Sequence, residues 1–216
     1  MTALDEQDLT RDRILQAALE SFAERGFKAT TVRDICSQAG VNVASVNYYF
    51  RSKEALYKEA LVYSFKEADR KYPPAALTSE LLTPEDRLHP FIRNMLLRLM
   101  DNGQLGLHAK LMAREIADPT AALDYVVETV MRPRFKQLRE LLPHFVGEGW
   151  PAADIDRFIL CVIGQCMIYR HARPMVERLC PGTMTSPDAI DRTAEVIFKF
   201  SLAVLRQLGH EQGHKA

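Results

Sequence analysis

Apolar residues recur every three or four positions along most of the chain, and no segment alternates with the two-residue period of a strand. The first such stripe, which includes Ile14 and Phe22, predicts a helix that begins after Thr10 and ends near Gly26. Residues 1–9 are mostly polar and acidic, and we expect them to form a disordered or fraying arm. The pattern predicts an all-α protein.

Two short helices joined by a tight turn are predicted next. Thr31 and Asp34 have the spacing of a capping box, so a helix should follow Thr31 directly. Gly40 ends this helix, because glycine adopts the left-handed conformation that a sharp reversal requires. Asn42 is a suitable N-cap for a second helix, which reaches Phe50. The segment therefore has the organisation of a helix-turn-helix.

The second of these helices combines a buried face with a polar one. Val46 and Phe50 should face inward, whereas Ala44, Ser45, Asn47 and Tyr48 cover the rest of the circumference. Small, hydroxyl, amide and phenol side chains suit base edges and phosphates. The pattern alone does not distinguish a DNA-binding hairpin from an ordinary helical hairpin with a solvated face.

A third helix begins after Ser52 and has Lys53 in its first turn. A phosphate at this helix start would be attracted by the ammonium group and by the free backbone N–H groups. The whole chain has 28 basic and 28 acidic residues, which counts against a non-specific nucleic-acid binder. Residues 25–60, however, contain six basic and three acidic residues, a modest positive patch at the predicted hairpin.

The rest of the chain is predicted to form longer helices. Pro73 and Pro74 end the helix 53–71, and Pro133 should kink a later helix near Thr129, because proline removes one backbone hydrogen bond. The predicted helices after Ser52 cover residues 53–71, 83–101, 107–117, 120–142, 155–171 and 187–208.

The fold class predicted is all-α: an N-terminal three-helix helix-turn-helix domain plus a larger C-terminal helical domain for ligand binding and dimerisation (about nine helices). The DNA-binding domain is expected at residues 10–55, with helix 53–71 as connector, and the C-terminal domain at residues 73–209. The last two helices, residues 155–171 and 187–208, are apolar beyond what one internal core explains. We therefore expect them to pair with a second subunit in a homodimer, which also suits a palindromic DNA site.

No catalytic constellation is found in the sequence. It contains no nucleophile motif, phosphate-binding loop or metal-binding motif, and its six histidines are scattered, so we predict no catalytic residues, no metal and no cofactor. Arg114 and Glu115 are expected to form an inter-helix ion pair. The four cysteines are expected to be mostly buried free thiols, with a redox role for Cys161 and Cys166 as the less favoured alternative. The chain has no secretory signal pattern, and its longest apolar run is too short to span a bilayer, so a cytoplasmic location is expected.

Long helices with a proline kink leave gaps, and ligand cavities are mostly apolar. Gln165 is the preferred contact residue, because an amide within an apolar run needs a partner. The candidate ligand-binding residues are Met95, Leu99, Met112, Tyr125, Phe135, Gln165 and Tyr169.

The segment ATTVRDICSQAGVNVASVNYYFRSKEALY resembles the N-terminal signature of the TetR family of bacterial regulators, within a match over residues 11–61. The resemblance implies that helix 43–50 enters the major groove of DNA as the recognition helix. Many relatives have tyrosine at the position of Asn47, whose amide suits a bidentate contact to adenine. By the same resemblance, Thr31, Arg33, Tyr49 and Lys53 contact phosphates, and Val43, Ala44, Ser45, Asn47 and Tyr48 face bases or the adjoining backbone.

Two further segments, MAREIADPTAALDYVVETVMRPRF and QCMIYRHARPMVERLCPG, resemble the C-terminal domain of a CecR-like subgroup of this family. Its members are generally repressors linked to export of, or tolerance to, toxic compounds. The resulting hypothesis is a homodimeric repressor that a small, largely apolar ligand releases from a palindromic operator. The alternatives are an activator or ligand-independent regulator, and a helical enzyme or carrier with a non-functional hairpin.

Overall fold

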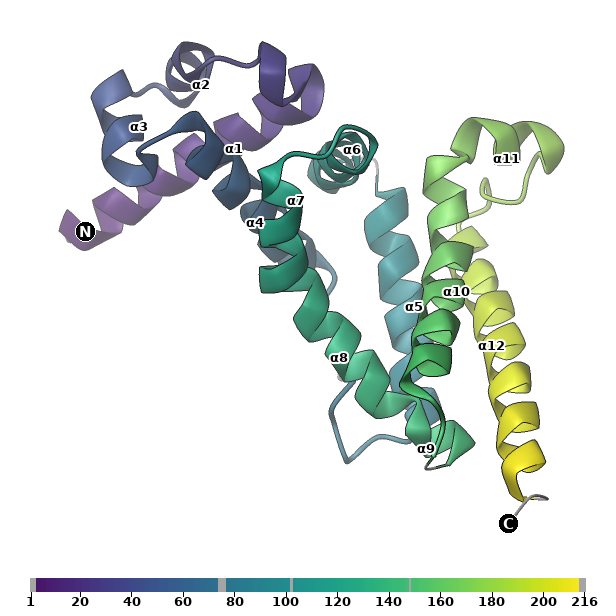
Figure 1. Cartoon of the computed structure of the whole chain (residues 1–216). Helices are drawn as coiled ribbons and strands as arrows, with labels where there is room; N and C mark the ends of the chain where they lie inside the picture. The colour runs from purple at the N-terminus through teal and green to yellow at the C-terminus, as the bar shows by residue number, and fades with distance from the viewer. Residues whose placement is uncertain (1–2, 74–76, 102, 148, 214–216) are drawn as a thin grey trace. The chain divides into compact units, whose positions relative to one another are not determined.

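The computed structural model describes residues 3–73, 77–101, 103–147 and 149–213 (Figure 1). Every regular element in these ranges is helical, which confirms the all-α prediction. The elements are α1 (Ala3–Ala29), α2 (Val32–Ala39), α3 (Val43–Phe50), α4 (Lys53–Lys71), α5 (Pro84–Met100), α6 (Gln104–Ala117), α7 (Ala121–Val126), the π-helix η1 (Val127–Met131), α8 (Arg132–Leu141), α9 (Pro143–Val146), α10 (Ala152–His171), α11 (Arg173–Leu179) and α12 (Ala189–Gly213).

The prediction of a disordered arm before Thr10 was wrong, because α1 already begins at Ala3. The break expected near Gly26 is present: this glycine has φ 81° and ψ 168°, which separates the main helix from one further turn. The short helices α9 and α11 were not predicted.

The helices form two compact units, and these units do not follow chain order. The first comprises residues 1–71 and 102–131, and the second comprises residues 72–101 and 132–216. The helix α6 thus packs against α1 and α4, and α7 packs against α4, although both follow α5 of the second unit along the chain. The functional division into a DNA-binding domain, a connector helix and a regulatory domain stays a proposal.

The first unit has one continuous apolar core. An aromatic group in this core joins α1 to α4, with ring centroids of Phe22 and Tyr57 at 4.8 Å and of Phe27 and Tyr57 at 4.9 Å. Phe27 packs against the core cluster to which the buried residues of the hairpin helices also belong. The largest side chains of this core include Ile14, Leu15, Phe22, Ile35, Val46, Phe50, Leu56, Leu61, Leu111 and Val126.

The corner between α6 and α7 is fixed to α4 by a buried carboxylate. Glu115 is only 1% exposed, and it accepts hydrogen bonds from the Tyr57 hydroxyl at 2.7 Å, from Thr120 N–H at 2.8 Å and from the Thr120 hydroxyl at 2.9 Å. Burial, followed by the hydrogen bond to Glu115, raises the pKa of Tyr57 far above its usual value, so the hydroxyl keeps its proton.

The neighbouring Arg114 connects the same corner to the end of α1. Its guanidinium donates to the carbonyls of Ala23 at 3.1 Å and Glu24 at 2.8 Å. These carbonyls lie in the last turn before Gly26, where no intrahelical partner remains for them. The expected ion pair of Arg114 and Glu115 was therefore wrong in its partners, because each binds neutral groups on other elements.

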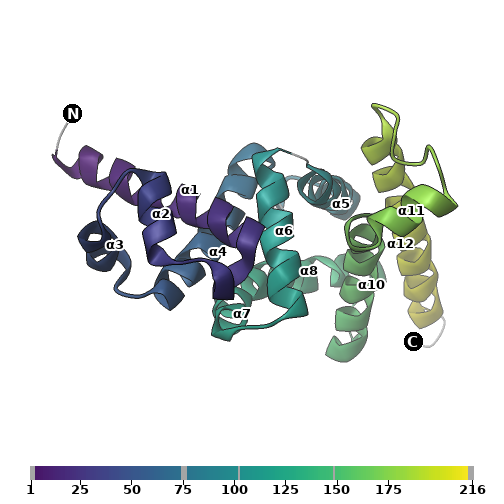
Figure 2. The same ribbon diagram turned by 90° about the horizontal axis from the view of Figure 1, so that it is seen from above.

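In the second unit α5, α10 and α12 lie side by side (Figure 1, Figure 2). Thr83 caps α5, accepting from the Asp86 N–H at 3.1 Å. Arg87 is buried and donates to the carbonyls of Leu77 and Leu82, which closes the chain before α5 against this helix. The core of the unit includes Leu88, Ile92, Leu96, Leu138, Leu141, Ile155, Ile159, Val162, Cys166, Ile197 and Leu205.

The helix is irregular at Thr129, the residue near which Pro133 was predicted to kink it. The π-helix Val127–Met131 separates α7 from α8 at this residue. Pro133 lacks the N–H that would bond to the Thr129 carbonyl four residues earlier, and a π-turn widens the helix where such a bond is lost. The chain leaves the first unit directly after this turn.

Two of the four cysteines are more exposed than predicted. Cys36 and Cys166 are buried, whereas Cys161 and Cys180 are exposed, and all four are free. Burial raises the pKa of Cys166 to about 12, so this thiol stays neutral. In the part of the chain that the structure describes, no helix is long and apolar enough to cross a membrane.

Replacing Tyr57 by phenylalanine removes one of the donors to the buried Glu115 carboxylate. We expect Tyr57→Phe to lower the free energy of unfolding by about 1–3 kcal/mol, the usual loss when a buried polar group loses a partner. Tyr63→Phe, on the same helix, is the control, since no hydrogen bond of its hydroxyl is found among the described residues. Urea unfolding measures both, and equal losses would contradict the assigned role of Tyr57.

Candidate nucleic-acid interface

The helix-turn-helix has the caps that the sequence predicted. Thr31 Oγ1 accepts from the N–H of Asp34 at 3.2 Å, and the Asp34 carboxylate accepts from the N–H of Thr31 at 3.1 Å. Hydrogen bonding to the Asp34 carboxylate from the Thr31 side chain, and then from the Thr31 backbone N–H, lowers the pKa of Asp34 below its usual value. Gly40 has φ 65° and ψ 40°, the left-handed conformation that ends α2.

The N-cap of α3 and its buried side chains together fix how this helix is oriented about its axis. Asn42 Oδ1 accepts from the N–H of Ser45 at 2.8 Å and from the Ser45 hydroxyl at 3.0 Å. Val46 and Phe50 are buried in the core of the first unit. Because they are four residues apart, they occupy one face of the helix, and the opposite face points outward.

The outward face of α3 consists of Val43, Ala44, Asn47 and Tyr48, which are all exposed. Tyr48 is the most prominent, with 72% of its surface exposed. Ser45 and Tyr49 are half-buried; the Tyr49 ring lies against Tyr48, with centroids at 5.1 Å. The structure thus brings four of the predicted base-facing residues onto one accessible face.

The predicted phosphate contacts Thr31 and Arg33 lie exposed at the start of α2. Lys53 is half-buried in the first turn of α4, where its ammonium lies 4.5 Å from the centroid of the Phe27 ring and 3.4 Å from the Lys28 carbonyl oxygen. Since Lys28 lies three residues before Thr31, the start of α4 adjoins the segment that leads into α2. The Lys53 ammonium therefore reaches the segment that leads into α2.

Most acidic side chains around the hairpin are already paired. Asp118 pairs with Lys28 at 2.8 Å, and Glu59 pairs with Arg11 at 2.9 Å. For Arg33, Arg51 and Lys53, no ion pair occurs within the described ranges of the chain. The positive charge of the hairpin is therefore concentrated on the side chains nearest to α3.

Arg51, which ends α3, has an unusual backbone conformation, with φ 62° and ψ −37°. Among the described residues it is the only non-glycine residue with positive φ. Its N–H bonds to the Asn47 carbonyl at 3.1 Å, which closes the last turn of the helix. An L-residue with a side chain is strained in this region, so the structure holds Arg51 there at some loss of stability.

The predicted ligand-binding residues do not gather in one unit. Met112 is buried in the core of the first unit, and the Tyr125 hydroxyl donates to Glu59 at 3.3 Å in the same unit. The amide of Gln165 donates to the Cys161 carbonyl at 3.3 Å, so its partner belongs to its own helix. The remaining members, which pack around the core of the second unit, are Met95, Leu99, Phe135 and Tyr169.

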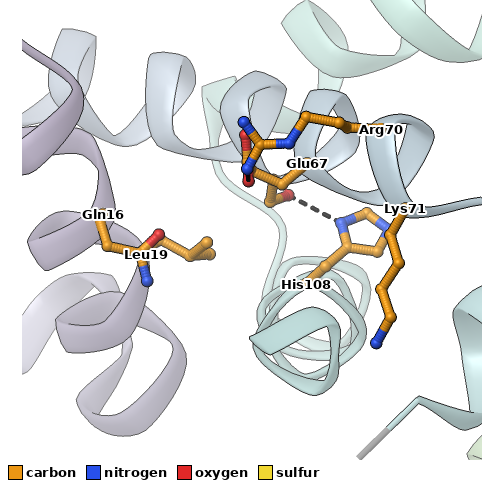
Figure 3. Close-up of a pocket in the computed structure, with 7 residues that line it drawn as sticks. Gln16, Leu19, Glu67, Arg70, Lys71 and His108 are labelled. Carbon is orange, nitrogen blue, oxygen red and sulfur yellow. Dashed lines mark hydrogen bonds and ion pairs between the residues drawn. The ribbon is translucent and has the colours of Figure 1, made fainter. Parts of the chain in front are cut away.

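Sequence reasoning missed a polar cavity in the first unit, which is shown in Figure 3. Its volume is about 430 Å³, and it lies between α1, α4 and α6. The periodicity that marks a buried stripe gives no signal for polar residues that meet from three helices. Within the described residues, no group of three histidine, cysteine or acidic side chains could hold a metal ion. The cavity is lined by Gln16, Leu19, Ser64, Glu67, Arg70, Lys71 and His108.

Comparison with known protein families assigns both parts of the chain. Residues 14–60 match the family described as bacterial regulatory proteins, tetR family. Residues 84–205 match the C-terminal domain of the HTH-type transcriptional dual regulator CecR. The second match alone covers more than half of the 216 residues.

Individual relatives agree with this assignment. The chain is 33% identical over 188 residues to the HTH-type transcriptional dual regulator CecR of Shigella flexneri, a match that covers 82% of this chain and 81% of that protein. Over 51 residues it is 51% identical to the HTH-type transcriptional repressor KstR2 of Mycolicibacterium smegmatis, which covers 24% of this chain and 25% of the repressor. The fold resembles that of a TetR-like transcriptional regulator from Rhodococcus sp., with a TM-score of 0.60 at 16% identity, over 91% of this chain and 95% of that chain.

Replacing Arg51 by glycine should relieve the backbone strain at the end of α3. We expect Arg51→Gly to raise the free energy of unfolding by about 0.5–1 kcal/mol. This gain is the energy that a side chain costs in the left-handed region, reduced by the larger conformational entropy that glycine loses on folding. Arg33→Gly, which removes a second exposed arginine but from regular helix, should lower it by about 1 kcal/mol. Thermal unfolding of both variants measures the difference, and a loss of stability in Arg51→Gly would contradict the assigned strain.

Proposed function

Because this chain belongs to the TetR family of bacterial regulatory proteins, and is thus a DNA-binding transcriptional regulator, we propose that it works as a homodimeric repressor. In this proposal the dimer binds a palindromic operator in the cytoplasm, and a small, largely apolar molecule releases it. The observation that carries the proposal is the accessible face of α3, whose opposite side is anchored in the core by Val46 and Phe50.

The proposed DNA contacts divide into two kinds. Asn47 and Tyr48, together with Val43, Ala44 and Ser45, face the bases or the adjoining backbone in the major groove. Thr31, Arg33, Tyr49 and Lys53 bind phosphates, and Lys53 does so from the first turn of α4. Support comes from the exposure of most of these side chains and from the local excess of positive charge.

The proposed dimer interface consists of α10 and α12. Large apolar side chains on both helices are exposed in the single protomer: Leu160 and Ile168 on α10, and Val196 and Phe200 on α12. Val196 is 66% and Phe200 is 62% exposed, and they are four residues apart on one face. Exposed apolar surface of this kind is typical of a protein–protein interface.

Gly164 lies halfway between Leu160 and Ile168 on the exposed side of α10. A Cβ atom added there would meet no other heavy atom of the protomer within 4 Å. Glycine inside a helix lowers its stability by about 1 kcal/mol relative to alanine, and nothing within the protomer offsets this loss. Close approach of a partner helix at Gly164 accounts for its presence.

The effector is proposed to bind among the apolar side chains around the core of the second unit, where Met95, Leu99, Phe135 and Tyr169 lie and where Gln165 supplies an amide. Met112 and Tyr125 have partners in the first unit, so we confine the proposed contacts to these five. The effector can shift the protein only by binding one state more tightly than the other.

The helix α4 is the proposed lever between effector and DNA. Its first turn carries Lys53, and after Lys71 at its other end the chain enters the second unit. Tyr57 on α4 is bonded to Glu115 on α6, while Arg114 on α6 is bonded to the end of α1. A shift of α4 or α6 therefore has to move the helices that carry the DNA-binding face, because buried hydrogen bonds connect them.

A mobility-shift assay on the DNA upstream of the protein's own gene tests the proposal. We expect a shifted band that survives an excess of random competitor DNA and that disappears when small apolar drugs are added. A band that random DNA removes as easily as upstream DNA would contradict operator binding. It would instead favour a helical enzyme or carrier that has lost this function.

Regulation in both directions is the second candidate function, since the relative that matches 82% of the chain is named a dual regulator. A reporter gene behind the upstream DNA distinguishes repression alone from regulation in both directions. Deletion of the regulator raises expression from every bound promoter if it only represses, and lowers expression from some of them if it also activates.

We expect Asn47→Ala and Lys53→Ala to weaken DNA binding in different ways. Asn47→Ala should relax the preference at particular base pairs, with a loss of about 1–3 kcal/mol on the preferred site only. Lys53→Ala should weaken binding to all sequences and reduce the salt dependence by about one phosphate contact. Fluorescence anisotropy on operator and random DNA measures both, with Lys136→Ala on α8 as control. Equal losses on the two DNAs for both variants would contradict these roles.

Gly164→Leu should convert the dimer into a monomer, because the new side chain clashes only with a partner helix. Within one protomer the site has room, so circular dichroism should show unchanged helix content. Lys136→Leu adds a comparable exposed leucine on α8 and should leave the dimer intact. Size-exclusion chromatography with light scattering measures the mass, and a dimeric Gly164→Leu protein would rule out a contact at this position.

A further inference from the structure

We propose that Arg51, at the corner between α3 and α4, binds a phosphate of the DNA backbone in addition to the contacts described above. This inference rests on the DNA-binding role proposed for α3, and it extends the contact surface from the outward face of that helix to its C-terminal end. The observation that carries it is the backbone conformation of Arg51, which a residue with a side chain adopts only with strain.

The corner itself is a three-residue turn. The Ser52 N–H donates to the Phe50 carbonyl at 2.7 Å, so the hydrogen bond closes around Arg51 alone. With φ 62° and ψ −37°, Arg51 lies near the γ-turn of positive φ, which is rare and strained. Hydrogen bonds hold the turn from both helices: the Arg51 N–H donates to the Asn47 carbonyl at 3.1 Å, and the Ser52 hydroxyl accepts from the Ala55 N–H at 3.1 Å. The fold therefore imposes this conformation on the residue at position 51.

Glycine is the residue that such a position favours, and the chain uses it elsewhere. Gly40, at the other corner of the hairpin, has φ 65°. Every other residue of positive φ in the described part of the chain is also a glycine: Gly26, Gly147, Gly149 and Gly182.

The Arg51 side chain does not offset the strain from within the protomer. Among the described residues its guanidinium has no ion pair and no hydrogen bond, and the side chain is exposed. A residue held in a strained conformation without a local stabilising contact points to a function of its side chain. For an exposed, unpaired cation beside a DNA-binding helix, the matching partner is a phosphate.

Arg51 also occupies the right face of α3. Ala44, Asn47 and Tyr48 are exposed, and position 51 follows them at the spacing i, i+3, i+4 and i+7 that places residues on one side of a helix. Because the Arg51 N–H still bonds to the Asn47 carbonyl, its Cα continues the path of that helix. With α3 in the major groove, a long cationic side chain at its end reaches the phosphates that border the groove.

A purely structural role for this charge makes a different prediction. A cation at the C-terminus of a helix interacts favourably with the helix dipole, and α3 has only eight residues. Loss of that interaction changes the free energy of unfolding, but it does not change how many counterions are released when DNA binds. The salt dependence of DNA binding therefore distinguishes a phosphate contact from a dipole contact.

Arg51→Gln keeps a side chain on the strained backbone and removes only the charge. On upstream DNA and on a random duplex, we expect it to weaken binding about three- to tenfold and to reduce the slope of log K against log salt by about 0.9, the value for one phosphate. Arg51→Lys, which keeps the charge, should retain most of the affinity and the full slope. Lys66→Gln removes an exposed cation farther along α4 and is the matched control. Fluorescence anisotropy at several salt concentrations measures all four proteins.

Arg51→Gly separates binding from stability. It should unfold at a higher temperature than the wild-type protein and yet bind DNA as weakly as Arg51→Gln, opposite changes that a loss of folding cannot produce. An unchanged affinity and slope in Arg51→Gln, or an equal loss in Arg51→Lys, would overturn the phosphate contact while the DNA-binding role of α3 stands. A wild-type protein that binds neither DNA would overturn both.

Discussion

Burial of Val46 and Phe50 determines which side of α3 faces outward, and the rest of the molecule depends on this orientation. Each buried apolar side chain of this size stabilises the folded state by about 1.5–3 kcal/mol, enough to exclude rotation of a helix this short. Caps at Thr31 and Asn42 then set where α2 and α3 begin. The exposed face that results, with Tyr48 at its centre, owes its position to the core beneath it rather than to its own contacts.

The same first unit contains the elements through which that face can be moved. The carboxylate of Glu115 joins α4 to the corner between α6 and α7, and Arg114 joins this corner to the end of α1. Buried polar contacts of this kind specify one arrangement, because any other leaves a charge without partners. The cavity beside His108 lies between the same three helices. The proposed DNA-binding face, the helices coupled to it and this cavity are thus parts of one packed body.

Local chemistry made much of the fold predictable. The caps at Thr31 and Asn42 depend on residues within a few positions of each other, and the structure confirms both. It also has a π-helix where Pro133 was predicted to kink the chain. The early start of α1 was missed because its arm contains no apolar stripe, although acidic residues also favour a helix start.

Contacts between distant segments were not predictable in the same way. Glu115 binds Tyr57, which is 58 positions away, and Thr120 at the next helix cap. The spacing of apolar residues along the sequence does not predict such pairs. The exposure of Cys161 was not predictable either. An apolar helix indicates that its faces are covered, but the sequence does not say whether the same protomer or a partner subunit covers them. For the proposed interface, the sequence predicted the exposed face of α3 but not the strain at Arg51, which only backbone angles reveal.

Photo-cross-linking from α3 tests the central claim most directly. With benzoylphenylalanine in place of Tyr48, irradiation of the complex with upstream DNA should attach the protein covalently to that DNA. The same group in place of Leu81, which is 97% exposed in the second unit, should give no such product. Equal yields from both positions, or a bound complex that never cross-links from position 48, would contradict a recognition role for α3.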